Sequence, residues 1–82
     1  MIKGVFAIKD TKSEFWSPFA HFNEQTAQRE FALMVNSIDN PVAQNPADYE
    51  LWQVGSYDTT TGVIEPLLLF VCNGFSVKKV SE

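Results

Sequence analysis

The stretch VIEPLLLFVC at residues 63–72 constrains the fold more than any other part of the chain. Successive side chains of a β-strand point to opposite faces of its sheet, and in this stretch both faces would be apolar. One face would carry Leu67, Leu69 and Val71, and the other Leu68, Phe70 and Cys72. We therefore predict a strand that needs cover on both faces. Pro66 has no backbone N–H, which places the strand at a sheet edge or at a bulge.

Three further segments complete the predicted fold. Residues 1–10 and 49–58 alternate as strands, and the DTTTG segment at 58–62 is typical of a hairpin connection. Residues 23–38 carry apolar residues at helical spacing, and Asn23 is a suitable N-cap. We expect an α+β fold in the order β-α-β-β, with one helix packed on one face of a three-stranded sheet.

The cover for the second sheet face stays open at this stage, because one helix covers only one face. The candidates are the aromatic segment EFWSPFAHF at 14–22, the C-terminal segment at 73–82 and a second copy of the chain. Two-fold homodimers are the commonest oligomers, and they bury apolar strand surfaces of this kind. A symmetric homodimer is therefore the prediction.

The length of 82 residues fits a single domain. We expect residues 1–74 to form its core and residues 75–82 a tail that can be flexible. The only cysteine, Cys72, excludes an internal disulfide and a zinc site with several thiolates, which favours a reducing compartment. No apolar run approaches the ~20 residues that span a bilayer, so we expect a cytoplasmic protein without a membrane partner.

Reaction motifs are missing from the sequence. His21 and Glu24 are three residues apart but lack a third group for a metal or catalytic site. The serines have no nucleophile-elbow pattern, and the four glycines are too scattered for a phosphate-binding loop. We therefore expect a binding protein rather than an enzyme, with no catalytic residue, metal or cofactor.

The net charge of −4 argues against nucleic acid, but the charges are unevenly distributed. Residues 13–77 hold one basic residue, Arg29, against eight acidic ones. The lysines lie toward the two ends of the chain: Lys3, Lys9, Lys12, Lys78 and Lys79. If the ends meet in space, these lysines form a basic patch; ordinary solvated lysines are the simpler interpretation.

The aromatic segment at 14–22 has three interpretations. Its rings could fill the core, dock a protein, or stack on bases as in proteins that bind single-stranded nucleic acid. Phe15, Trp16 and Phe19, close in sequence to Lys9 and Lys12, fit the stacking interpretation.

Seven short stretches stand in order between residues 7 and 62: AIKDTKSE at 7–14, PF at 18–19, AxRxF at 27–31, VN at 35–36, NPxDYxL at 45–51, VGxYD at 54–58 and TG at 61–62. Together they resemble the small nonstructural protein of gokushoviruses, the single-stranded DNA phages of the Microviridae. The resemblance implies an early phage protein made in the cytoplasm of the bacterial host, absent from the mature capsid, and described as DNA-binding. After Gly62 the chain is more apolar than the family pattern.

The expected function is therefore that of a phage nonstructural protein that binds single-stranded DNA during genome synthesis or packaging. Stacking is assigned to Trp16 and Phe19, and phosphate contacts to Lys3, Lys9, Lys12, Lys78 and Lys79. The alternative is a non-enzymatic docking module that engages a host or phage replication protein through the aromatic segment.

Overall fold

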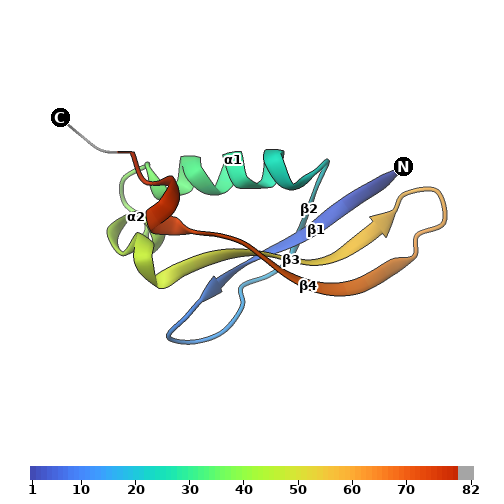
Figure 1. Cartoon of the computed structure of the whole chain (residues 1–82), viewed down its shortest axis with the longest axis horizontal. Helices are drawn as coiled ribbons and strands as arrows, with labels where there is room; N and C mark the ends of the chain where they lie inside the picture. The colour runs from blue at the N-terminus through green and yellow to red at the C-terminus, as the bar shows by residue number, and fades with distance from the viewer. Residues whose placement is uncertain (80–82) are drawn as a thin grey trace.

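Figure 1 shows the computed structural model, an antiparallel sheet with its helices gathered on one side, in which residues 1–79 are described. The small α+β class is confirmed. The strands, in the order β2-β1-β3-β4 across the sheet, are β1 (Ile2–Asp10), β2 (Phe19–His21), β3 (Tyr49–Asp58) and β4 (Ile64–Asn73). The helices are α1 (Glu24–Val35) and α2 (Pro41–Gln44), with the 3-10 turns η1 (Pro46–Asp48) and η2 (Gly74–Val77).

The expectation of a three-stranded sheet was wrong, because the sheet has four strands. The additional strand, β2, follows Pro18 inside the aromatic segment, where the predicted order β-α-β-β has no strand. It pairs with β1 through Gly4 opposite His21 and Phe6 opposite Phe19. Three residues are too few to show a period of two in the sequence, so this strand depends on its partner.

The start of α1 follows the prediction. The Asn23 side chain accepts a hydrogen bond from the Thr26 N–H at 2.9 Å, and the Thr26 hydroxyl accepts one from the Asn23 N–H at 3.3 Å. This reciprocal capping box satisfies two backbone donors that the first turn leaves free. The helix ends earlier than expected, at Val35, so Ile38 lies beyond the apolar stripe and is 83% exposed.

The hydrophobic core lies between α1 and one face of the sheet. Its largest fully buried side chains come from strands, α1 and α2: Phe6, Phe31, Val35, Val42 and Leu51. Ile8 of β1 and Cys72 of β4 belong to the same cluster. Because side chains alternate along a strand, the neighbours of Ile8 and Leu51 point to the opposite face, which no helix covers (Figure 1).

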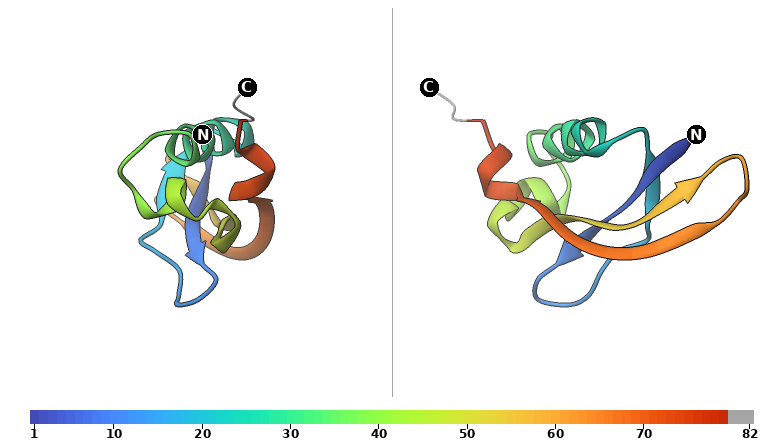
Figure 2. Two further views of the ribbon diagram at one scale, coloured as in Figure 1. Left: turned by 90° about the vertical axis from the view of Figure 1, so that its left-hand side faces the viewer. Right: turned by 45° about the vertical axis from the view of Figure 1, so that its right-hand side comes forward.

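The β3–β4 hairpin carries the long edge of the sheet. Gly62 in its turn has φ 79°, a left-handed conformation that glycine adopts without strain. β4 pairs only with β3, so the predicted edge position is confirmed. Figure 2 shows the hairpin curving away beyond the end of α1, which leaves much of β4 without cover.

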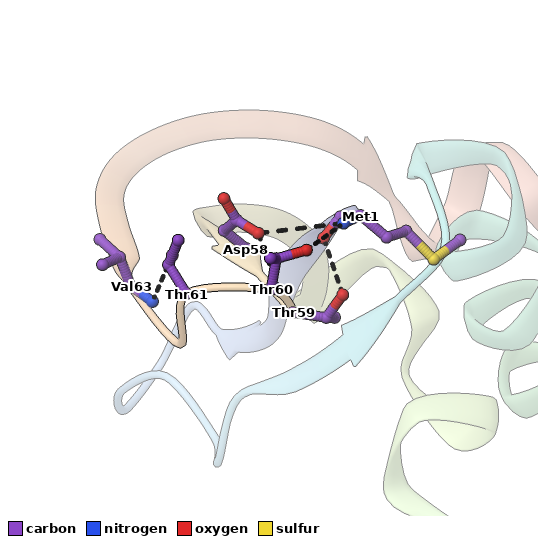
Figure 3. Close-up of polar contacts among 6 residues, drawn as sticks. All are labelled: Met1, Asp58, Thr59, Thr60, Thr61 and Val63. Carbon is purple, nitrogen blue, oxygen red and sulfur yellow. Dashed lines mark hydrogen bonds and ion pairs between the residues drawn. The ribbon is translucent and has the colours of Figure 1, made fainter.

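Polar contacts attach the beginning of β1 to this hairpin turn (Figure 3). The Met1 carbonyl accepts hydrogen bonds from the Thr59 N–H at 2.8 Å and from the Thr59 hydroxyl at 3.1 Å. The Met1 amino group lies 3.9 Å from Asp58 Oδ1, and the same carboxylate accepts from the Thr60 N–H at 2.8 Å. The Thr60 hydrogen bond holds the pKa of Asp58 below its ordinary value.

The C-terminal segment lies against α1. Val77 of η2 packs against the core, while Phe75 is 69% exposed. The Asn36 side chain donates to the Val77 carbonyl at 3.0 Å and accepts from the Lys79 N–H at 2.7 Å. Within the predicted tail these contacts place residues 77 and 79 against α1, and positions 80–82 lie outside the described residues.

Cys72 gives a prediction about thiol reactivity. Burial, with a smaller effect of the Glu24 charge, raises the pKa of its thiol to about 11. Because the thiolate is the reactive form, we expect folded protein at pH 8 to react with a maleimide roughly 100-fold more slowly than protein unfolded in urea. Equal rates, followed by mass spectrometry, would contradict this placement of Cys72.

Candidate functional site

Four side chains form a cluster on the sheet face opposite α1, which we name the open-face cluster: Lys9, Phe15, Trp52 and Phe70. The Lys9 ammonium lies 5.5 Å from the ring centres of both Phe15 and Trp52. The Trp52 ring lies 6.0 Å from Phe15 and 5.6 Å from Phe70, edge to face in both cases. None of the four belongs to the core between α1 and the sheet.

The sheet register places these side chains together. Phe15 forms an isolated bridge with Lys9, and the Trp16 N–H donates to the Ile8 carbonyl at 2.7 Å. The first half of the aromatic segment therefore runs along the outer side of β1, and Phe15 shares the Lys9 face. On the other side of β1, Trp52 of β3 is the cross-strand partner of Phe70 of β4.

The open-face cluster remains accessible. Phe15 is 38% exposed and Phe70 is 52% exposed, while Lys9 and Trp52 are half-buried. Among the described residues no carboxylate lies within ion-pair distance of Lys9. Glu50, its cross-strand neighbour, instead accepts a hydrogen bond from the Trp52 indole N–H at 3.0 Å. The face therefore presents aromatic surface and a lysine without an ion pair, with the Glu50 carboxylate beside it on the Trp52 indole.

The predicted stacking residues take different positions. Trp16 lies 5.5 Å from Tyr49, edge to face, and is 38% exposed. Phe19 packs against the core, with its ring 6.4 Å from Phe6. Phe19 is thus a packing residue on the helix side of the sheet, while Phe15 from the same segment joins the open-face cluster.

The five predicted lysines do not form one patch. Lys9 lies in the open-face cluster, Lys12 is exposed in the following loop, and Lys3 lies over the Phe22 ring at 5.0 Å. Lys78 and Lys79 follow η2, beside the C-terminal end of α1. In Figure 1 the segment after η2 and the start of β1 lie at opposite ends of the molecule, so the lysines of the two groups do not meet.

Acidic groups flank the Trp16 side of the site. Burial, together with the charges of Asp10 and Asp48, raises the pKa of the Tyr49 hydroxyl. Because Tyr49 is the aromatic neighbour of Trp16, the negative potential of these carboxylates extends to that ring. The cluster around Lys9 holds one carboxylate, that of Glu50, and one ammonium, so it is better suited to an anionic ligand than the surroundings of Trp16.

Two residues of the site, Trp52 and Phe70, were missed as candidates. The sequence placed Trp52 on one face of its strand and Phe70 on one face of another. Their contact depends on a register shift between β3 and β4 at Leu51 and Trp52, which no sequence pattern shows. A signal that could have found them is the aromatic residue in each of two strands joined by a hairpin, because such residues can contact each other across the pair.

A hollow lies between β2 and α1, on the helix side of the sheet. It is lined mainly by apolar side chains, with His21 and Glu30 as its polar groups. The His21 ring packs edge to face on Phe19 at 5.8 Å.

Within residues 1–79 no three His, Cys, Asp or Glu side chains converge as metal ligands would. No helix in the same part of the chain is long and apolar enough to cross a membrane.

The fold and the open-face cluster describe a small α+β domain with one sheet face open to a ligand. The family model described as Phage ORF5 protein matches residues 3–77, and the chain belongs to this family. It is therefore a phage protein. Comparison with curated proteins gave no match. Comparison with solved structures gave none either.

Proposed function

We propose that the protein is a non-catalytic, single-stranded DNA-binding protein of a Microviridae phage, and that DNA lies across the open sheet face. The observation that carries the proposal is the position of the Lys9 ammonium, 5.5 Å from both the Phe15 and the Trp52 ring centres. Proteins that bind single strands combine a positive charge for the backbone with rings on which bases stack. The resemblance to gokushovirus nonstructural proteins points in the same direction.

The roles follow from exposure and charge. Phe15 and Phe70 offer ring surface for stacking, and Trp52 between them keeps their spacing. Lys9 binds a phosphate, and Lys12 extends the positive charge beyond the strand. Lys3 lies at the other end of β1 and would meet a longer oligonucleotide, while Lys78 and Lys79 lie outside this surface. Few phosphate contacts and an acidic body give weak binding that falls steeply with salt.

The test is fluorescence anisotropy of a labelled oligo(dT) at low and at physiological salt. Changing both Lys9 and Lys12 to Glu is expected to abolish binding at low salt, because each change replaces an attraction for phosphate with a repulsion. The matched control changes Lys78 and Lys79 to Glu, which alters the net charge equally but on the α1 side. An equal loss in both double variants would assign binding to net charge and contradict this site.

The second candidate is a docking module for a replication protein. It is favoured by the Trp16 side of the aromatic segment, where an exposed ring packs on Tyr49, whose hydroxyl is under the charges of Asp10 and Asp48, a setting unsuited to phosphate. Trp16→Ala separates the two functions. It should leave oligonucleotide affinity within about 2-fold if DNA lies on the open-face cluster, and it should remove protein capture if Trp16 docks a partner.

A further inference from the structure

Strand β4 and its flanks carry the largest group of exposed apolar side chains. Six of the thirteen large apolar side chains exposed in the described residues lie there: Val63, Ile64, Leu68, Leu69, Phe70 and Phe75. Their exposed fractions run from 52% to 69%. Edge strands are commonly protected by charged side chains, but residues 66–74 contain none. A surface of this composition is typical of an interface.

The backbone of β4 also has unpaired groups, and their direction follows from the sheet register. The Trp16 N–H donates to the Ile8 carbonyl, so the peptide groups of Ile8 face away from β3. In an antiparallel pair, the backbone N–H and carbonyl groups of two directly opposite residues either point toward each other or both point away. The backbone groups of Leu51, the partner of Ile8, therefore point away from β1 and toward β4.

The same alternation continues to the free edge. Trp52 follows Leu51, so its backbone N–H and carbonyl point back toward β1, and those of its partner Phe70 point away from β3. The backbone groups of Leu68, two residues earlier in β4, point the same way as those of Phe70. Both residues thus present a donor and an acceptor at an edge where, among the described residues, no further strand pairs.

We propose that β4 pairs with β4 of a second copy of the chain, antiparallel, about a two-fold axis at Leu69. In this register Leu68 of each copy lies opposite Phe70 of the other, and the two exchange backbone hydrogen bonds. Pro66 has no N–H to offer, which ends the pairing on one side. The register shift between Cys72 and Phe70 ends it on the other. This interface does not depend on the proposed function.

A second copy fits this edge better than an unrelated strand. Apolar side chains meet apolar side chains across the axis, and no like charges are opposed. The opposite sheet edge is the three-residue β2, too short to receive β4 of another molecule. The sheet can therefore extend once, at β4, which gives a closed dimer rather than a filament.

The available area agrees with a stable dimer. Ile64 and Gly74 are each five residues from Leu69, so the axis brings Ile64 of one copy level with Gly74 and Phe75 of the other. Without Phe70, whose ring stays open to a ligand, the five other exposed side chains contribute roughly 100 Å² each, or roughly 1,000 Å² over both copies. This lies at the lower end of the range for specific interfaces.

The pairing has a consequence for the open-face cluster. A two-fold axis perpendicular to the sheet keeps each face on its own side, so both clusters lie on one surface. Phe70 of each copy then stands next to the seam between them. The dimer would present the two clusters side by side to one ligand.

The test is the mass of the full chain in solution, without DNA, by sedimentation equilibrium. Wild type is expected at twice the 9.2 kDa of one chain at tens of micromolar. Leu69→Lys places two like charges at the axis and should weaken association at least ~100-fold. Leu33→Lys, on the exposed side of α1 and equally accessible, is the matched control and should leave the mass unchanged.

A second variant isolates the strand pairing. Leu68→Pro removes an N–H that faces the free edge and leaves the β3 ladder intact, so it should produce a monomer with wild-type circular dichroism. A monomeric wild type would overturn the proposal. A dimer that survives Leu68→Pro but not Leu69→Lys would overturn edge pairing and assign the contact to packing of sheet faces.

Discussion

Replacing Phe31 with alanine is expected to lower the free energy of unfolding by about 3–5 kcal/mol. Phe31 is 2% exposed and lies in the middle of α1, where it fills the space between the helix and the sheet. Truncation removes the transfer free energy of the ring and leaves a cavity that a small core cannot fill by rearrangement. In a domain of this size the loss approaches the whole stability.

Chemical denaturation followed by circular dichroism measures this effect, with Leu33→Ala as the control. Leu33 is on the same helix and 60% exposed, so its truncation should change the free energy of unfolding by no more than about 0.5 kcal/mol. Similar losses at both positions would mean that α1 does not present Phe31 to the sheet.

Replacing both Phe15 and Phe70 with alanine is expected to weaken binding of oligo(dT) at least ~10-fold, since stacking contributes about 1–3 kcal/mol for each base. Both rings contact Trp52 at the edge of the open-face cluster and are partly exposed. Neither belongs to the hydrophobic core, so the variant should stay folded. The salt dependence of the remaining binding should be unchanged, because Lys9 is retained.

Anisotropy titrations at several salt concentrations measure both quantities. Ile38→Ala, which removes an 83% exposed apolar side chain remote from the cluster in sequence, serves as the control and should bind as wild type does. If the double variant keeps wild-type affinity, stacking on these rings is excluded and binding to the face would be electrostatic alone.

The elements with a strong local signal were predictable from the sequence. Alternation identified the strands that became β1 and β3, the Asn23 cap fixed the start of α1, and Gly62 marked the hairpin. Each of these depends on residues close together in the chain. Pro66 indicated an edge or a bulge, and β4 lies at the sheet edge with a register shift that ends at Pro66.

The features that the sequence did not predict depend on contacts between segments that are distant in the chain. β2 exists because β1 offers it a partner, and Phe19 points into the core because that short strand fixes its face. The open-face cluster needs the pairing of Trp52 with Phe70 and the bridge between Lys9 and Phe15. Long-range register of this kind is invisible in a single sequence, so the aromatic segment alone could not show that Phe19 packs against the core and Phe15 on Trp52.

The most direct test of DNA binding on the open sheet face is the tryptophan emission of Trp16→Phe, in which Trp52 is the only remaining indole. If bases stack on the open-face cluster, oligo(dT) at low salt should quench this emission saturably, and physiological salt should restore it. Trp52→Phe, which keeps Trp16, should bind DNA with a smaller change in emission. Trp52 emission that stays constant while anisotropy reports bound DNA would place the DNA elsewhere, and the absence of any binding at low salt would contradict the proposed function.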